Sequence, residues 1–290
     1  ENEKLVANHF NTYYCQMANN LRGAAADTGR ETLNPEAVAW EHSAMTWREV
    51  SEQEIVTIIK NLPNKKSKGL DGWSTDEIKA LGEIIAYPLS VLINASISQG
   101  YFPDALKTSV IVPIWKSGAR KEVKNYRPIS LLSVFSKIFE LCMKSQLLNY
   151  LHCKSFFSDH QYGFLKGKST DLATYDQVTY ISEGLENRMK VGGLYLDLAK
   201  AFDMVDPERL LDKLMKIGVR DGILKWLRSF LIGRRQRVKI GEKLSDEEMV
   251  QQGTPQGSTL SPILFLIYVN HLTNVRIRGT IYSFADDTAV

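Results

Sequence analysis

Cysteine and long hydrophobic runs are both scarce in this sequence. Its 290 residues include three cysteines, Cys15, Cys142 and Cys153, an odd number without the short spacings of metal ligands. We therefore exclude a cysteine-built metal site and interpret the three as reduced thiols of an intracellular protein. The longest apolar run, Ile263 to Val269, is far too short to span a bilayer, so no membrane partner is expected.

Net positive charge is also low, because the formal total is only +3 with 24% charged residues. A net charge this small does not by itself indicate nucleic-acid binding. Together with 44% hydrophobic residues, it argues against a disordered chain. The distribution of charge along the chain is more informative. Seven cations occur between Lys225 and Lys243 with a single acid, Glu242, and a second basic cluster runs from Lys116 to Arg127. Such runs are usually solvated surface, but two of them beside motifs weaken that explanation.

In the first third of the chain, helices are predicted after about residue 45. Residues 1 to 45 show only weak hydrophobic periodicity. Ser51 to Glu54 and Ser74 to Glu77 are capping boxes that predict two helix starts. A further apolar helix is expected from Leu89 to Ile97, ending near Gly100.

Strands and helices alternate irregularly in the remaining two thirds. Strands are expected at Val110–Trp115, Gly192–Leu198, Arg237–Ile240 and Thr280–Phe284, with helices between them. Because there is no regular βαβ rhythm and no internal repeat, the pattern predicts an α+β fold rather than a doubly wound sheet.

Acidic residues follow two of these apolar segments. Asp197 ends one strand, and the pair Asp286-Asp287 follows another. A turn is the ordinary explanation of an Asp pair, and a strand-end or cap role is the ordinary explanation of Asp197. Carboxylates at neighbouring strand tips are also what a site needs to hold two hard divalent cations around a phosphoryl group.

Six motifs occur in an order that resembles the reverse transcriptase domain of non-LTR (LINE-type) retrotransposons. They are Asn125-Tyr-Arg127-Pro128-Ile-Ser-Leu-Leu132, Gln161-Tyr-Gly163-Phe164, Ser169-Thr170, the Asp197 strand, Gly253-Thr-Pro255-Gln256-Gly257 and Phe284-Ala-Asp286-Asp287. The likeness runs from about Trp47 to the end of the chain. A single motif would be weak support, whereas six in order are highly specific.

The resemblance implies a right-hand polymerase with fingers and palm, the palm being a small antiparallel sheet backed by helices. We expect residues 1–105 to form an N-terminal helical extension and residues 106–290 to form the fingers and part of the palm. Because the chain opens without Met and stops three residues after Asp287, we expect a piece of a longer protein, truncated before the thumb.

For the site, the resemblance implies catalytic roles for Asp197, Asp286 and Asp287. These carboxylates, with the backbone carbonyl of Leu198, would ligate two Mg²⁺ ions, for which Mn²⁺ is an alternative. The reaction would be template-directed addition of a deoxynucleotide to a primer 3′-hydroxyl, with an RNA template, a DNA primer and dNTPs as partners.

Nucleotide-binding roles are implied for five further residues. Lys116 and Arg127 match the cations that clamp the incoming triphosphate, although a structural salt bridge would also explain Arg127. Phe202 matches the bulky residue under the sugar, with core packing as its alternative. Gln256 and Gly257 match a turn at the nascent base pair.

The basic cluster is expected to track template or primer phosphates without reading sequence. The residues assigned to this role are Arg234, Arg235, Arg237 and Lys239. A nuclear location at the site of integration follows from the resemblance as an expectation. Two other functions stay open: an RNA-directed RNA polymerase, which Phe202 argues against, and an inactive relic or domesticated nucleic-acid-binding scaffold.

Overall fold

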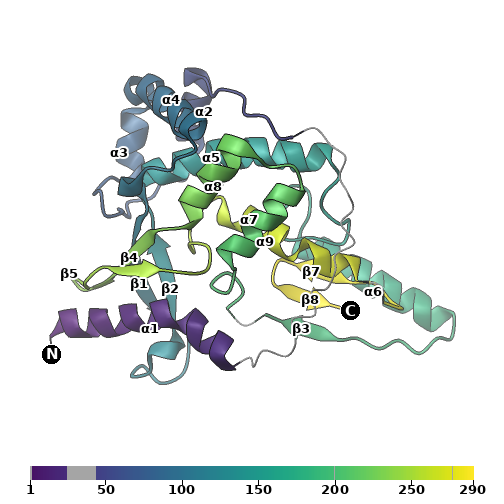
Figure 1. Cartoon of the computed structure of the whole chain (residues 1–290). Helices are drawn as coiled ribbons and strands as arrows, with labels where there is room; N and C mark the ends of the chain where they lie inside the picture. The colour runs from purple at the N-terminus through teal and green to yellow at the C-terminus, as the bar shows by residue number, and fades with distance from the viewer. Residues whose placement is uncertain (1, 25–43, 199, 276) are drawn as a thin grey trace.

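Helices interleave with two β-sheets in the computed structural model, which describes residues 2–24, 44–198, 200–275 and 277–290 (Figure 1). The predicted α+β class is confirmed. The helices are α1 (Glu3–Ala24), α2 (Glu52–Asn61), α3 (Thr75–Ala80), α4 (Gly82–Gln99), α5 (Val134–Cys153), α6 (Thr170–Glu186), α7 (Pro207–Lys216), α8 (Asp221–Leu231) and α9 (Ser261–Val269). The strands are β1 (Thr108–Trp115), β2 (Tyr126–Leu131), β3 (Tyr195–Asp197), β4 (Arg234–Ile240), β5 (Lys243–Leu244), β6 (Glu248–Val250), β7 (Tyr282–Phe284) and β8 (Asp287–Ala289). Short 3₁₀ turns, η1 (Asp104–Leu106), η2 (Val123–Asn125) and η3 (Asn270–Asn274), complete the elements.

Both predicted capping boxes begin helices. The backbone N–H of Ser51 donates to the Glu54 carboxylate at 3.0 Å, and the Ser51 hydroxyl accepts from the backbone of Glu54. Ser74 and Glu77 make the same reciprocal pair at the start of α3. Each box satisfies two orphan N–H groups within one helical turn, which is why local sequence predicts it.

The larger sheet has five strands in the order β2-β1-β4-β5, and β6 pairs with the other part of β4. The β1–β2 pair is an antiparallel hairpin, whereas β1 and β4 run parallel, with Ile111 beside Val238. The predicted strands Val110–Trp115 and Arg237–Ile240 lie within β1 and β4, so both are confirmed.

Helix α1 packs across one face of this sheet, below it in Figure 1. Ala7, Phe10 and Tyr14 form a small hydrophobic cluster with Ile111 and Val238. The sequence did not predict this helix, because its periodicity is weak: Asn11 interrupts the buried apolar side, and Leu5 and Val6 are exposed. Asn11 donates to the backbone of β4 and accepts from Gln236.

The smaller sheet has three antiparallel strands in the order β3-β8-β7, and α6 packs against β7. Its strand pairs join Tyr195 to Ala289 and Tyr282 to Ala289. A small antiparallel sheet backed by helices was expected at the acidic motifs; the antiparallel sheet is present there, and α6 packs against it.

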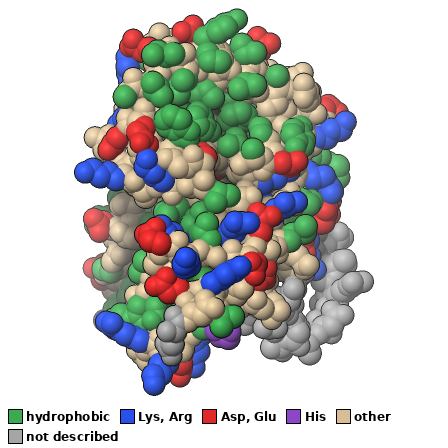
Figure 2. Space-filling model, turned by 90° about the vertical axis from the view of Figure 1, so that its left-hand side faces the viewer, with side chains coloured by type: hydrophobic (Ala, Val, Ile, Leu, Met, Phe, Trp, Pro, Cys, Tyr) green, Lys and Arg blue, Asp and Glu red, His purple; other side chains and the backbone are tan. Residues whose placement is uncertain are grey.

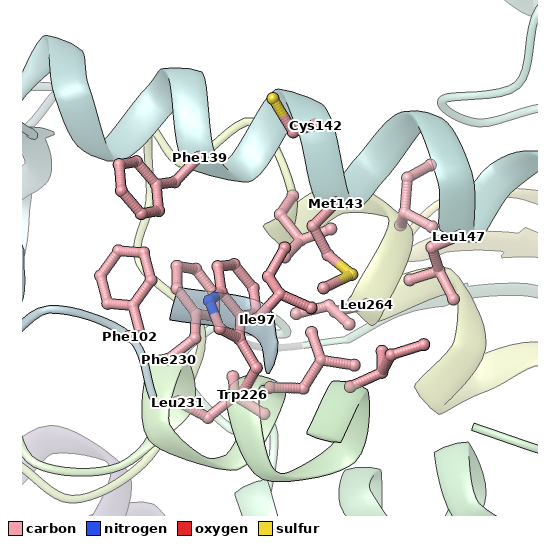
Figure 3. Packing of buried hydrophobic residues seen from close by; sticks show 14 of the residues in the cluster. Ile97, Phe102, Phe139, Cys142, Met143, Leu147, Trp226, Phe230, Leu231 and Leu264 are labelled. Atoms are coloured by element: carbon pink, nitrogen blue, oxygen red, sulfur yellow. The ribbon is translucent and has the colours of Figure 1, made fainter. Parts of the chain in front are cut away.

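The main hydrophobic core lies between α4, α5, α8 and α9 (Figure 3). Trp226 and Phe230 of α8 stack with their planes 3° apart, and Phe102 meets both rings edge-on. The buried indole N–H of Trp226 donates to Ser96 at 2.9 Å, so its polar atom is satisfied. This core includes residues from both sides of the boundary expected after residue 105, which stays a prediction.

Helix α4 is apolar on its outer as well as its inner side. Ala86, Leu89 and Ile93 are buried, while Ile84 and Tyr87 are exposed. Figure 2 views the molecule from the left-hand side of Figure 1 and shows hydrophobic side chains gathered on the upper part of that surface, where Figure 1 places α2, α3 and α4. Among the residues that the structure describes, no helix combines the length and apolar character needed to cross a bilayer.

Candidate active site

Asp197 and Asp287 lie directly opposite each other on the neighbouring strands β3 and β8. Leu194 and Val290, three pairs away on the same ladder, exchange both backbone hydrogen bonds at 2.8 Å. Because hydrogen-bonded and non-hydrogen-bonded pairs alternate, the two aspartates occupy a non-hydrogen-bonded position. Side chains at such a position share a face, with Cα atoms about 4.5 Å apart. The expected adjacency of these strands is confirmed.

Asp286 occupies the two-residue turn between β7 and β8, since Phe284 and Asp287 are register partners. Its side chain is half-buried. Burial raises the pKa of Asp286, and the negative charges of Asp287 and Asp197 raise it further. The three carboxylates are therefore close enough to repel one another, a condition that a bound cation relieves.

Gln161 holds this turn in place, a role that the sequence did not assign to it. Its buried side-chain oxygen accepts from the backbone N–H of Gly163 at 2.8 Å and of Ala285 at 3.1 Å. A Cβ on Gly163 would lie 2.4 Å from the backbone nitrogen of Ala285, so only glycine fits. The Gln161-Tyr-Gly163 motif thus stabilises the turn between β7 and β8, which carries Asp286.

A cavity of about 350 Å³ lies between α6 and the three-stranded sheet, and Asp197 and Asp287 line it. Asp286 is not among the lining residues. Carboxylate oxygens are the ligands that Mg²⁺ prefers. Within the described part of the chain, no three His, Cys, Asp or Glu side chains are grouped closely enough to hold a metal ion. The donors therefore fit a hard divalent cation in chemistry, but they are not gathered around one position.

The segment that carries Gln256 is fixed to the loop after β3. The Gln256 amide nitrogen donates to both oxygens of Asp203, each at 2.9 Å, and Thr254 donates its backbone N–H to Phe202. Burial raises the pKa of Asp203, while the Gln256 amide opposes that shift. The structure thus makes Asp203 the hydrogen-bond partner of a predicted site residue.

Gly257 lies against β2 with a φ of +115°. A Cβ at this position would meet the carbonyl oxygen of Ser130 at 2.6 Å, and the backbone N–H of Ser130 donates to Gln256. Close approach of two backbones therefore requires glycine here.

Glu140 anchors the next stretch of this segment and was also missed. It is fully buried on α5 and accepts hydrogen bonds from Ser258 (2.6 Å), Thr259 (2.7 Å from the backbone) and Leu260 at the start of α9. Its other oxygen accepts from Ser136 at 2.8 Å. A buried carboxylate at a helix N-terminus is stabilised by the unpaired N–H groups there.

Lys116 and Arg127 lie together at the loop end of the β1–β2 hairpin. Arg127 is the register partner of Ile114, and the backbone of Lys116 donates to Asn125. Both side chains are exposed, and neither has an ion pair with any residue that the structure describes. Because Ile111 faces α1, alternation along β1 places Ile114 and Arg127 on the opposite face of the sheet.

The face of the large sheet opposite α1 is called the open face. Arg235, Arg237 and Lys239 of β4 lie on it. Val238 points toward α1, so its alternate neighbours point away from it. Arg235 pairs with Glu247 at 3.0 Å, which neutralises part of the positive charge.

Arg234 does not belong to this face, and the prediction that it contacts nucleic acid is corrected by its burial. Its exposed fraction is 4%, its guanidinium lies over the Phe230 ring, and one nitrogen donates to the Phe230 carbonyl at 3.1 Å. Burial lowers the pKa of Arg234 to about 10. The reason is strand alternation, which turns Arg234 inward where Arg235 turns outward.

Phe202 is half-buried, and its ring stacks on Phe265 of α9 with centroids 4.5 Å apart. The ring of Phe164 is nearly perpendicular to that of Phe202, with their centroids 6.1 Å apart. Phe202 therefore packs against the core through one face, and its proposed contact with a sugar stays a prediction. Leu198, whose carbonyl was expected to be a metal ligand, follows β3 directly and is partly exposed.

Comparison with known proteins identifies the family. The family model described as "Reverse transcriptase (RNA-dependent DNA polymerase)" matches residues 115–290, which include both acidic motifs. The chain belongs to the reverse transcriptase family. The LINE-type resemblance of the six motifs is likewise confirmed by similarity to proteins of mobile elements.

Three such relatives come from Drosophila melanogaster. The chain is 29% identical, over its whole length, to a probable RNA-directed DNA polymerase from transposon BS. It is 30% identical over 82% of its length to the probable RNA-directed DNA polymerase from transposon X-element. It is also 30% identical over 83% of its length to the RNA-directed DNA polymerase from mobile element jockey. This reverse transcriptase chain spans 33%, 26% and 27% of those three relatives.

Proposed function

We propose that this chain is the polymerising part of a retrotransposon RNA-directed DNA polymerase. The observation that carries the proposal is the register of the small sheet, which puts Asp197 opposite Asp287 with Asp286 in the adjoining turn. Family membership supports the same activity. The substrates would be dNTPs, a DNA primer and an RNA template, and the protein would act in the nucleus at the site of integration.

The cofactor would be a pair of Mg²⁺ ions, or Mn²⁺ in their place. Asp197, Asp286, Asp287 and the carbonyl of Leu198 would hold them. When bound, such ions activate the primer 3′-hydroxyl and neutralise charge on the triphosphate. The carboxylates must be ionised to bind these cations. Burial and the neighbouring negative charges raise the pKa of Asp286, and a bound cation would lower that pKa by favouring the ionised form.

The chain's other residues would position the nucleotide. The β1–β2 hairpin would serve as the fingers, with Lys116 and Arg127 donating to the triphosphate as a point charge and a planar fork. The three-stranded sheet would be the palm, and residues before about 105 would extend the fingers. Gln256 would meet the nascent base pair through its side-chain oxygen, because its amide nitrogen already donates to Asp203.

Replacing Phe202 with Val is expected to relax sugar selection. A ring beneath the sugar excludes a 2′-hydroxyl by contact, so removing it should raise NTP incorporation relative to dNTP at least tenfold, a change of about 1.4 kcal/mol. Single-nucleotide extension with matched dNTP and NTP measures this ratio. Leu224→Val, another half-buried apolar site that packs on the main core, is the control. An unchanged ratio would assign Phe202 to packing alone, and preferential NTP use by the unmodified protein would favour an RNA-directed RNA polymerase.

Neutralising the open face of β4 should weaken primer–template binding independently of sequence. In the triple variant Arg235→Gln, Arg237→Gln, Lys239→Gln, each lost phosphate contact should reduce the slope of log K against log salt by roughly 0.7–0.9. Fluorescence anisotropy across a salt series measures the slope. Arg228→Gln removes a cation of α8 that pairs with Glu208 and should leave the slope unchanged. A slope unaltered in the triple variant would mean that this face contacts solvent only.

A further inference from the structure

The loop that follows β3 is joined to the 253–257 segment by backbone contacts. The backbone N–H of Thr254 donates to the carbonyl of Phe202 at 3.0 Å. A Cβ on Gly253 would lie 2.8 Å from the Cα of Asp203, and Gly253 has a φ of +81°, so glycine is required at this approach. The two segments therefore meet directly beside Phe202, the residue expected beneath the sugar.

A side-chain hydrogen bond between Asp203 and Gln256 adds to these backbone contacts. The amide nitrogen of Gln256 lies 2.9 Å from each carboxylate oxygen of Asp203. Among the residues that the structure describes, none donates a hydrogen bond to the side-chain oxygen of Gln256. The nitrogen of this amide is therefore occupied, and its oxygen is left for a ligand.

The carboxylate of Asp203 determines which way the amide turns. An ionised carboxylate only accepts hydrogen bonds, so it admits the Gln256 side chain with its nitrogen inward. An asparagine at this position could accept from the amide nitrogen or donate to the amide oxygen, and would admit both orientations. Burial raises the pKa of Asp203, and the hydrogen bond from Gln256 and the charge of Lys200 oppose that shift. Asp203 is partly buried, so these two partners stabilise its ionised form.

The backbone of Gln256 is fixed separately by β2. Its carbonyl accepts from the backbone N–H of Ser130 at 3.2 Å. A Cβ on the next residue, Gly257, would lie 2.6 Å from the carbonyl oxygen of Ser130, so the two backbones are in close contact. With the backbone held in this way, the side-chain rotation of Gln256 is the main freedom left, and the hydrogen bond to Asp203 removes it.

We propose that Asp203 is a positioning residue for nucleotide binding. Its carboxylate holds the amide nitrogen of Gln256, so that Gln256 presents only its side-chain oxygen to the incoming nucleotide. This role rests on the proposed function, which places Gln256 at the nascent base pair. Asp203 acts through Gln256 rather than on the substrate. Because the loop of Asp203 also carries Phe202, the same contact fixes Gln256 relative to the residue expected beneath the sugar.

Nuclear magnetic resonance of the 290-residue chain tests the hydrogen bond without any need for polymerase activity. The side-chain amide signal of Gln256 is identified by its loss in Gln256→Met. In Asp203→Asn its exchange with solvent should be at least threefold faster, because the amide is no longer held in one orientation. Asp212→Asn changes an exposed aspartate of α7 and should leave this exchange unchanged.

Steady-state primer extension by protein that contains this chain separates positioning from folding. Asp203→Asn should raise the KM for dNTP about threefold to tenfold, as for the loss of one neutral hydrogen bond. The value of kcat should be largely retained, because binding rather than chemistry is weakened. Asp212→Asn is again the matched control and should leave KM unchanged.

A second substitution at Gln256 tests whether the two side chains act as a pair. Gln256→Glu alone brings a second carboxylate against Asp203, and the repulsion should raise KM further. In the double variant Asp203→Asn, Gln256→Glu, the asparagine amide can donate to the new carboxylate, which still presents an oxygen to the nucleotide. The KM of the double variant should therefore return toward that of the unmodified protein.

The outcomes distinguish this role from the polymerase activity itself. An unmodified protein that does not extend a primed RNA would refute the activity, while amide exchange would still report the contact between Asp203 and Gln256. In an active protein, unchanged KM and unchanged amide exchange in Asp203→Asn would overturn the positioning role. A double variant no better than Gln256→Glu would do the same. If Asp203→Asn does not fold, Gln256→Glu decides, because a wild-type KM in that variant would show that the two side chains are not in contact.

Discussion

Asp286→Asn is expected to abolish Mg²⁺-dependent extension of a primed RNA by protein that contains this chain. Two-metal stabilisation of the transferring phosphoryl group contributes several kcal/mol, so losing about 4 kcal/mol lowers the rate roughly 1000-fold. Chelation by EDTA should have the same effect, and Mg²⁺ should reverse it. Primer extension with labelled dNTP measures both.

The raised pKa of Asp286 gives this prediction a pH signature. Burial is the main cause that raises the pKa of Asp286, with the charges of Asp287 and Asp197 adding to it. A carboxyl with a raised pKa is protonated at higher pH than usual, so metal binding should weaken as pH falls toward that pKa. In protein without added metal, Asp287→Asn removes a like charge and should lower the pKa of Asp286.

Controls separate a metal role from general damage. Asp212→Asn changes an exposed aspartate of α7 and should leave extension unchanged. Far-ultraviolet circular dichroism of Asp286→Asn should match that of the unmodified chain. Full extension by a folded Asp286→Asn protein would refute the assignment of the carboxylates.

Glu140→Ala is expected to produce the largest loss of stability, about 3–5 kcal/mol. The substitution leaves the Ser258 hydroxyl and the backbone N–H of Thr259 without their acceptor in the interior, while the N–H of Leu260 keeps only the Ser258 hydroxyl oxygen. Because α9 begins at Ser261, a few residues after Gln256, the same change should loosen the segment that carries Gln256. Urea unfolding measures the free-energy change, and proteolysis between residues 251 and 260 reports the loosening.

Two further variants calibrate that loss. Glu140→Gln keeps one oxygen acceptor but brings an amide donor to the start of α9, so its cost should fall between wild type and Glu140→Ala. Glu242→Ala removes an acid that pairs with Lys239 on the surface and should change stability by less than about 1 kcal/mol. A loss of under 1 kcal/mol for Glu140→Ala would show that water replaces the carboxylate.

Several elements followed from the sequence because their signals are local. The capping boxes at Ser51 and Ser74 use hydrogen bonds within one helical turn, and the strands around Ile111 and Val238 show their own alternation. The acidic motifs and their order along the chain predicted the family and the pairing of Asp197 with the Asp287 strand, which the register confirms.

Other features were not predictable because they depend on which way a side chain turns or on a partner far along the chain. Helix α1 was missed since its periodicity is weak, with the polar Asn11 buried against the sheet and the apolar Leu5 exposed. Asp203, Gln161 and Glu140 gained their roles from residues 53, 124 and 119 positions away, respectively.

The sequence by itself determined the family and the α+β class, because motif identity and order need no coordinates. Only the tertiary structure decided which of two adjacent arginines is available to nucleic acid. Strand β4 alternates between the open face of the sheet and the face under α1, so Arg235 points to solvent while Arg234 points into the interior. A run of cations in sequence carries no record of that choice, since it is made by the register of β4 against β1 and by the helix packed on one side.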